Sequence, residues 1–345
     1  MKTENSICIV KCGASTPIGT TAKMSGEMAS VNMTRLLTHP LYKDRDDNPI
    51  ILSLASYIDR ANTVSERFKE LLAYALPDVL ARINVQDPSV FIGVPEPRSG
   101  LTDNDIDDVR LFTREILENN NITSSDMQIL PFGHCSALMG MEQACKELSQ
   151  GRKFCIAGGI ESYFAFETLT WLSARNRLKT RSNKFGFTPG EAAGFVLLTT
   201  EKTAEQNNIP VLAELVAVST CTEKHTIDKD TVCQGRGLSK AMAAVLQSLP
   251  ENSRIDHIFC DLNGERYRTD EYGFAYLNNK KYFNRASSVT APAHLWGDIG
   301  AAAGPNLINL AIMSGEKQSY NLIWTSSDSG KRSALLLKIT GEKNG

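Results

Sequence analysis

The sequence lacks any run of about 18 consecutive apolar residues, so it predicts no transmembrane helix. It also lacks an excess of either charge, because 37 Lys and Arg residues against 39 Asp and Glu residues leave a formal net charge of −2. A near-neutral chain has no global field that would favour nucleic acid or an anionic membrane. We therefore expect neither of these as a partner.

The cysteines lack the pattern of a disulfide framework or a metal site. Eight cysteines are scattered along the chain, mostly within apolar runs, and no CxxC pair occurs. This usage predicts reduced, buried thiols in a cytoplasmic protein. Cys221, His225 and Cys233 lie close together in the sequence, but a fourth zinc ligand is missing, so we predict no metal site.

The phosphate-binding and hydrolase motifs are missing as well. The segment GASTPIG (13–19) matches neither GxGxxG nor GxxxxGK[ST], and no GxSxG is found. The sequence thus predicts neither a dinucleotide site, nor a P-loop, nor a serine nucleophile elbow.

What the 345 residues do contain is an alternation of strand-like and helical segments in both halves of the chain. This alternation predicts an α/β fold with mostly buried strands. A polar segment that ends in proline (201–210) is the expected joint, which divides the chain into residues 1–205 and 206–345. The expected strands are 7–13, 89–95, 154–162, 192–201, 211–220, 255–264, 321–330 and 332–340, and the expected helices are 64–83, 103–120, 237–249 and 297–315.

The segment PFGHCSALMGMEQACKEL (131–148) places Cys135 at the start of a helix with an apolar stripe. A thiol at a helix N-terminus lies at the positive end of the dipole, which predicts a lowered pKa and a reactive thiolate. The alternative is a buried structural thiol, and helix position alone does not separate the two.

Four segments, in this order, resemble the β-ketoacyl-acyl-carrier-protein synthases, the condensing enzymes of the thiolase fold. They are IVKCGASTPIG (9–19), GHCSALMGMEQACKELSQGRKFCIAGGIES (133–162), FGFTPGEAAGFVLL (185–198) and GDIGAAAG (297–304). The resemblance spans nearly the whole chain. It implies a five-layered αβαβα sandwich made of two similar halves, with Cys135 as the nucleophile that accepts an acyl group. Glu191, in the third segment, is expected to be structural.

The chain departs from the family where most synthases have two histidines that serve decarboxylation. Asn263 stands at the first of these positions and Asp298 at the second. As replacements, Asn263 could donate a hydrogen bond to a developing enolate, and Asp298 could act as a base or orient His294. A role for His294 only in capping or packing is the competing interpretation.

Residues next to these positions are candidate substrate contacts. His134 precedes Cys135, although neighbours on a turn usually point apart. Glu265 and Arg266 belong to a polar segment (261–273) that follows an apolar strand, where α/β proteins build sites. The alternative for this segment is an exposed loop.

The segment ARNRLKTRSNK (174–184) has five basic residues and no acid. Its place in the resemblance implies a docking surface for an acidic carrier protein, formed by Arg175, Arg177, Lys179 and Arg181. A solvated loop is the alternative.

The resemblance therefore implies an acyltransferase that forms an acyl thioester on Cys135 and condenses or transfers the acyl group. Its substrate would be linked to phosphopantetheine or coenzyme A, with an acyl carrier protein or acyl-CoA as partner and no cofactor of its own. It also implies a homodimer, or a heterodimer with a paralogue. The missing histidines leave two alternatives open: a catalytically impaired partner subunit of the chain-length-factor kind, and an acyltransferase or thioesterase that does not decarboxylate.

Overall fold

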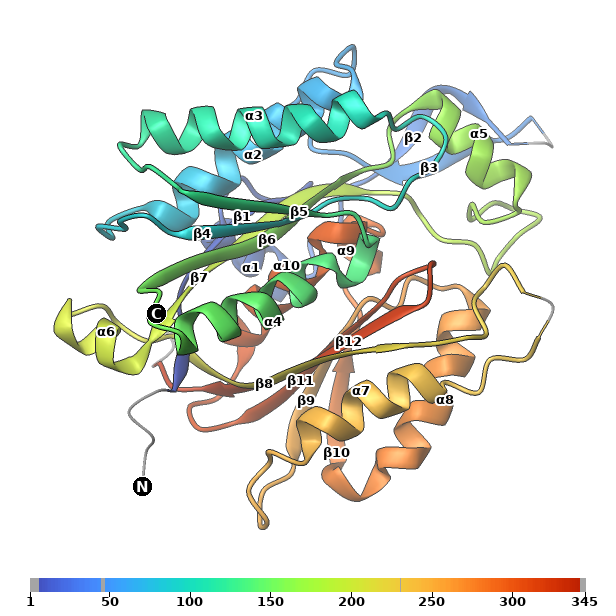
Figure 1. The fold of residues 1–345 in the computed structure, drawn as a ribbon. Coiled ribbons are helices and arrows are strands. Elements are labelled where there is room, and N and C mark those ends of the chain that lie inside the picture. Colours follow the sequence, from blue (N-terminus) through green and yellow to red (C-terminus); the bar gives the residue numbers. More distant parts are fainter. Residues whose placement is uncertain (1–5, 45–46, 230, 342–345) are drawn as a thin grey trace.

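A computed structural model describes residues 6–44, 47–229 and 231–341. Three layers of helices alternate with two layers of sheet, as Figure 1 shows. Helices α2 (Val64–Leu80) and α3 (Asp103–Asn119) cover one outer face, and α7 (Arg236–Leu246) and α8 (Arg266–Asn279) cover the other. Helices α4 (Ser136–Ser149) and α10 (Ala303–Ser314) lie between the sheets and contact both of them. The predicted five-layered αβαβα sandwich is confirmed.

The two halves have the same strand topology. Hydrogen bonding joins ten strands in the order β10-β9-β11-β12-β8-β1-β7-β6-β4-β5, and β1 pairs with β8 in antiparallel orientation where the halves meet. If the five strands of each half are numbered in chain order, both halves arrange them from this seam outward as first, fifth, fourth, second and third. The parallel and antiparallel pairings are also the same in both halves. The strands of the first half are β1 (Ile7–Ser15), β4 (Ser89–Gly93), β5 (Asp126–Leu130), β6 (Phe154–Ser162) and β7 (Glu191–Thr200). Those of the second half are β8 (Ala213–Thr222), β9 (Ile255–Cys260), β10 (Phe283–Thr290), β11 (Tyr320–Ser326) and β12 (Lys331–Ile339).

The repeat extends to the starts of the two central helices. A 3₁₀ turn (Gly133–Cys135) leads into α4 and another (Gly300–Ala302) leads into α10. Gly133 and Gly300 both have positive φ, of 60° and 44°, a conformation that glycine adopts without steric cost. Cys135 and Ala302 then take nearly the same backbone angles, with φ −80° and ψ −15° against φ −82° and ψ −5°.

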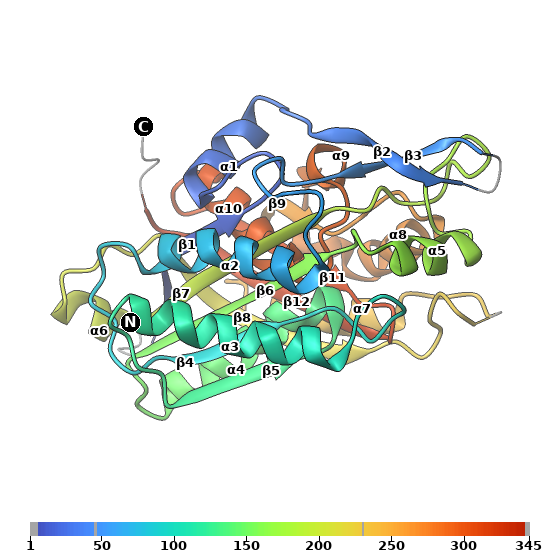
Figure 2. The same ribbon diagram turned by 90° about the horizontal axis from the view of Figure 1, so that it is seen from above.

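The remaining elements lie around this framework. A separate two-stranded sheet, which the sequence did not predict, runs beside α9 (Figure 2) and is tied to it by a hydrogen bond from Arg35 N to Leu295 O of 3.0 Å. Among the described residues, no helix is long and apolar enough to cross a membrane. These further elements are β2 (Leu36–Lys43), β3 (Pro49–Ser53), α1 (Ala22–Ser30), α5 (Phe166–Ala174), α6 (Glu201–Gln206), α9 (Ala293–Trp296) and a 3₁₀ turn (Lys280–Tyr282).

Local sequence explains why the outer helices begin where they do. Thr63 and Glu66 form a capping box at the start of α2, and Thr102 and Asp105 form another at α3. In the adjoining sheet, Gly159 is required for packing, because a Cβ there would lie 2.1 Å from Ala301 O.

Glu191 is buried at the start of β7, where it receives hydrogen bonds of 2.6 and 2.7 Å from the Arg67 guanidinium of α2. Both side chains are at most 1% exposed. Ala55 N and Ser162 Oγ also donate to the Glu191 carboxylate. This buried pair ties α2 to the sheet and confirms that Glu191 is structural.

Candidate functional site around Cys135

Cys135 lies at the start of α4, as the sequence predicted, and is fully buried. Its Sγ is 3.1 Å from the carbonyl oxygens of both Thr325, near the end of β11, and Lys331, at the start of β12. The S–H proton is therefore directed at a backbone acceptor. A thiolate would face two carbonyl dipoles of the wrong sign.

The prediction that helix position lowers the pKa of Cys135 was wrong. Burial raises the pKa of the thiol, and this outweighs the opposing effects of Ser327, Thr325 and the Arg332 charge. The helix dipole does act at this position, but water is excluded from the sulfur, so the neutral thiol is favoured.

The backbone N–H of Cys135 is occupied as well. It donates a 2.9 Å hydrogen bond to Ser327 Oγ, whose hydroxyl donates in turn to Phe132 O. This N–H is the group that would be expected to stabilise a thioester oxyanion. The β11–β12 turn (residues 327–330), taken together with the strand ends that flank it (residues 325–331), thus covers both the thiol and the N–H of residue 135.

The two unusual positions, Asn263 and Asp298, are brought together with His134 and not with the sulfur. His134 Nε2 lies 2.8 Å from Asp298 Oδ1, and Asn263 Nδ2 donates to Asp298 Oδ2 at 2.7 Å. Gly300 N donates a third bond to this carboxylate, at 2.8 Å. Within the part of the chain that the structure describes, no hydrogen bond joins Cys135 to any of these three side chains.

Charge partners set the protonation of this chain of residues. Burial alone would raise the pKa of Asp298, but His134, Arg268 and the Asn263 bond hold it well below its usual range. Burial alone would lower the pKa of His134, yet the Asp298 charge opposes this and the net shift is upward. Asp298 is therefore an anion that orients the imidazole and favours its protonated form.

Two buried arginines extend the network toward the β11–β12 turn. Arg177 bonds both Glu265 oxygens at 2.7 Å and Asp328 Oδ2 at 2.5 Å. Arg268 on α8 lies 3.2 Å from Asp261 Oδ2, 3.3 Å from Asp328 Oδ1 and 3.4 Å from Glu265 Oε2. Such charge-assisted bonds fix the position of the turn that covers Cys135.

This network corrects the predicted docking surface. Arg177 is only 7% exposed and is held by two carboxylates, so it is not available to a partner. Arg175, Lys179 and Arg181 are exposed, and the Arg175 guanidinium lies 4.3 Å from the centre of the Trp171 ring. The segment is thus part solvated loop and part buried anchor.

Two further predicted site residues lie outside the cluster. His294 is exposed and bonds Ala291 O at 3.1 Å, which agrees with the capping interpretation and removes it as the partner of Asp298. Arg266 is exposed and lies 3.4 Å from Asp270. Glu265, by contrast, is buried within the network. Residues 261–265 form a loop in which Asp261, Asn263 and Glu265 are buried, and residues 266–273 form the start of α8, so the segment is not an exposed loop.

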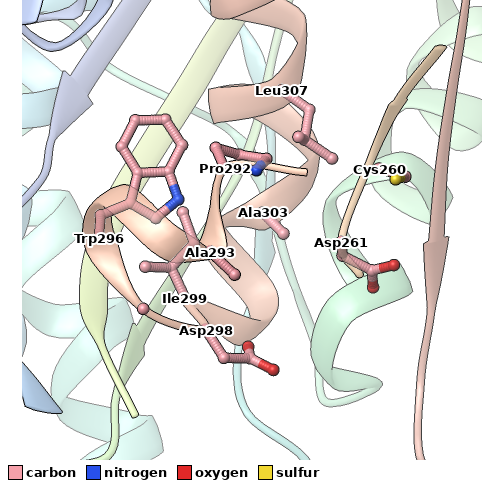
Figure 3. A pocket seen from close by; sticks show the side chains of 10 residues that line it. Cys260, Asp261, Pro292, Ala293, Trp296, Asp298, Ile299, Ala303 and Leu307 are labelled. Carbon is pink, nitrogen blue, oxygen red and sulfur yellow. The ribbon is translucent and has the colours of Figure 1, made fainter. Parts of the chain in front are cut away.

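A small cavity of about 20 Å³ adjoins Asp298 (Figure 3). Asp261 and Cys260, at the end of β9, face Trp296 and Ile299 across it. This volume suffices for one water molecule and for no organic substrate.

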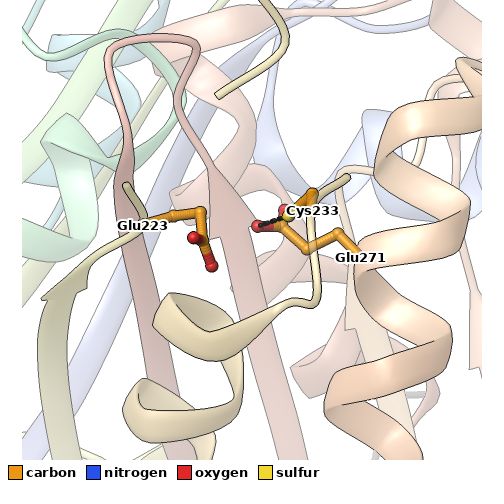
Figure 4. A group of neighbouring side chains, drawn as sticks. All are labelled: Glu223, Cys233 and Glu271. Atoms are coloured by element: carbon orange, nitrogen blue, oxygen red, sulfur yellow. Dashed lines mark hydrogen bonds between the residues drawn. The ribbon is translucent and has the colours of Figure 1, made fainter. Parts of the chain in front are cut away.

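The cysteine and histidine segment 221–233 forms no zinc site in the described residues. Cys233 meets Glu223 and Glu271 instead, and the three side chains point toward one another (Figure 4). Glu271 is neutralised by Arg332 at 2.6 Å, and Glu223 accepts three backbone N–H bonds. Because these partners already use the carboxylates, the group is suited to holding α8 and not to binding a cation.

Neither a protein-family model nor a curated protein matches the sequence. Solved structures do match. A chain from a structure described as a type II polyketide synthase acyl-carrier protein in complex with its ketosynthase bound to the hexaketide matches with a TM-score of 0.80 and 13% identity, over 98% of this chain and 100% of that one. This chain has the ketosynthase fold.

Other structures with the ketosynthase fold agree. The ketosynthase from module 6 of the bacillaene synthase from Bacillus subtilis 168 matches with a TM-score of 0.77 and 13% identity, over 98% of this chain and 72% of that one. The ishigamide ketosynthase/chain length factor matches with a TM-score of 0.73 and 15% identity, over 97% of this chain and 100% of that one. At such identities the match concerns the fold, and the chemistry must be argued from the residues.

Several residues of the site were missed by sequence reasoning. Ser327, which covers the N–H of Cys135, and Asp328, which receives both arginines, lie in a turn where the sequence predicts the end of a strand (321–330). Arg268 lies in a segment dense in charge, where nothing distinguished it from its exposed neighbours. The one available signal was the polarity of the segment 326–334 beside an apolar hairpin.

Proposed function

We propose that this chain is a ketosynthase-fold subunit of an acyl-condensing complex in which Cys135 is not the acyl-carrying thiol. The observation that carries the proposal is the double coverage of residue 135 by the β11–β12 turn. The thiol is held at the Thr325 and Lys331 carbonyls, and the N–H is bonded to Ser327 Oγ.

The chemistry explains why this matters. Thiolate attack needs the thioester carbon about 3–3.5 Å from the sulfur, with the carbonyl oxygen at the N–H donor. Both places are filled by protein atoms. In addition, Asn263 and Asp298 are bonded to each other and to His134, so neither is directed at the sulfur.

In such a complex a second subunit of the same fold would supply the reactive cysteine, and the acyl chain would arrive on phosphopantetheine or coenzyme A. The exposed Arg175, Lys179 and Arg181 are the surface that we assign to an acidic carrier protein. Reversal of these three charges should abolish carrier binding measured at low salt, whereas reversal of the distant, exposed Lys23 should not. Equal binding by both variants would refute the assignment.

Intact-mass measurement tests the main proposal. The protein is incubated with acyl-CoA and with acylated carrier, and a free peptide thiol in the same mixture shows that the donor is reactive. We expect no acyl adduct on Cys135. An adduct that forms on the wild type and on Cys221→Ala, but not on Cys135→Ala, would overturn the proposal.

That last result would support the second candidate, acyl transfer through Cys135 after the turn opens. The position of Cys135 in the first turn of α4, next to an imidazole with an aspartate partner, favours this candidate. Release of carbon dioxide that occurs only with malonyl donors would then indicate condensation. Formation of an acyl-transfer product from acetyl donors would indicate transfer without decarboxylation.

A further inference from the structure

A polar cavity of about 160 Å³ has His134 in its lining. Its lining comes from the loop after β4, the end of β6, α5 and the β11–β12 turn, and it reaches the surface at Pro97 and Ser329. The residues that matter for the argument are Arg98, His134, Tyr163, Trp171, Phe187 and Asp328. Cys135 is not part of this lining.

Size limits what the cavity can hold. An apolar cavity of about 150 Å³ in another protein is known to take up one benzene molecule. Three aromatic side chains line this one, and the rings of Tyr163 and Phe187 meet edge-on with centres 5.5 Å apart. A single aromatic ring therefore fits both the volume and the walls.

The charges that line the cavity limit the ligand further, because each cationic side chain in the lining already has an anionic partner. Arg98 lies 2.5 Å from Glu161, Arg177 lies 2.5 Å from Asp328, and His134 lies 2.8 Å from Asp298. The Glu96 carboxylate accepts hydrogen bonds from the backbone N and hydroxyl of Ser329. An anionic ligand would lose its hydration and gain no unpaired cation in the described lining. Besides the paired anions, a cationic ligand would meet there only Glu96, whose oxygens already accept from Ser329, and Asp228, which is exposed at the rim.

Within the described part of the chain, Arg98 Nε is enclosed without a partner, and two further polar atoms of the wall remain to be satisfied. The His134 side chain is 6% exposed and its Nε2 is used by Asp298, but Nδ1 has no hydrogen-bond partner among the described residues. The hydroxyl of Tyr163, a residue only 6% exposed, likewise has none within those residues. Neither atom is sealed from the cavity, since neither belongs to the enclosed polar atoms without a partner.

We propose that this cavity binds a neutral, single-ring ligand that carries a hydroxyl group, with the hydroxyl at His134 Nδ1 and Tyr163 and the ring against Trp171 and Phe187. A hydroxyl both donates and accepts, so it satisfies Nδ1 whether or not that nitrogen carries a proton. The inference goes beyond the proposed function and does not depend on the role of Cys135, so acylation of Cys135 would leave it standing.

Phenol, benzoate and benzylamine test the proposal, because they share a ring and differ in charge. The chain has five histidines, so selective ¹³C labelling of the imidazoles gives few signals, and the His134→Gln variant identifies the relevant one. Phenol should shift the His134 signal saturably and bind at least tenfold more tightly than either ion. No saturable shift, or equal affinity for the three probes, would overturn the proposal.

Two tyrosine variants separate the cavity from general effects. Tyr163→Phe keeps the ring and removes one hydroxyl contact, so it should weaken phenol binding about fivefold to tenfold. Tyr74→Phe removes a hydroxyl from an exposed residue on α2 and should leave binding unchanged. Retention of full affinity in Tyr163→Phe would refute the assigned contact, and Cys135→Ala should bind phenol like the wild type.

Discussion

Removal of the Ser327 hydroxyl should expose Cys135 to alkylation. In the native protein the thiol can react only after the β11–β12 turn moves away from it. That movement breaks at least three bonds: from Cys135 N to Ser327 Oγ, from Ser327 to Phe132 O and from Arg332 to Ser327 O. The bonds of Asp328 and Ser329 hold the same turn and add to the cost. Two neutral bonds at about 1 kcal/mol each and one charged bond at about 1.5–3 kcal/mol set a lower limit of roughly 3.5–5 kcal/mol on the opening cost.

This cost converts to a rate. At about 1.4 kcal/mol per factor of ten, this lower limit of roughly 3.5–5 kcal/mol slows alkylation of Cys135 by at least about 300-fold to 4,000-fold relative to an open thiol of the same pKa. The Ser327→Ala variant loses two of the three bonds, about 2 kcal/mol, and its Cys135 should react about 30-fold faster than in the wild type.

Alkylation with iodoacetamide, followed by peptide mass spectrometry over time, measures each cysteine separately. Half-buried Cys221 provides the internal reference, and denaturant shows that every thiol can react. Ser333→Ala is the matched control, because it removes a buried hydroxyl of β12 that bonds Thr220 at 3.0 Å and, among the described residues, bonds neither Cys135 nor Ser327. The reasoning fails if Cys135 reacts as fast as Cys221 in the wild type, or if Ser327→Ala and Ser333→Ala alkylate alike.

Three further predictions concern stability. Glu191→Gln leaves Arg67 buried without its anion and should lower the free energy of unfolding in urea by about 3–5 kcal/mol; a loss below 1 kcal/mol would contradict the role of the pair. The pKa of His134 is raised by folding, so its contribution to the free energy of unfolding is complete below about pH 6.5 and is lost as the pH rises through the folded pKa. The pKa of Asp298 is lowered by folding, so its contribution is complete above about pH 4 and is lost as the pH falls. Urea unfolding of the wild type and of His134→Gln between pH 5 and 9 should therefore converge toward high pH, and parallel curves would refute the assignment. Gly159→Ala forces a Cβ against Ala301 O and should reduce soluble folded protein or lower the melting temperature by several degrees, while Gly273→Ala, which has open space, should not.

Most of the framework was predictable because its signals are local, although the edge strands β5 and β10 were not predicted. Strands of the central sheet are apolar runs of suitable length, and all nine residues of β6 are buried, as expected of a strand covered on both faces. Helix α8 was not predicted, for a physical reason. Its buried face includes Arg268, Glu271 and Asn279, which are satisfied by ion pairs and hydrogen bonds, so the apolar periodicity that marks other helices is absent.

The chemistry of the site was less accessible to sequence reasoning. The helix start at Cys135 follows from nearby residues, and its position was correct. The state of the thiol depends on Thr325, Ser327 and Lys331, which are 190 or more positions away in the chain. Contacts at that separation leave no trace in the spacing of residues, so a prediction based on the helix dipole alone gave the wrong sign for the pKa.

The repeated strand order has a consequence for how reactivity can arise in this chain. The backbone that presents Cys135 is built a second time at Ala302, with a glycine of positive φ two residues earlier in both cases. The fold thus contains two helix starts with equivalent backbone conformations between its sheets. Only their side chains differ: His134 and Cys135 at the first, Ala301 and Ala302 at the second. An Ala302→Cys variant would place a second thiol on the same backbone among different neighbours. Comparison of the alkylation rates of the two thiols within one molecule would separate the effect of the helix start on thiol reactivity from the effect of the turn that covers Cys135.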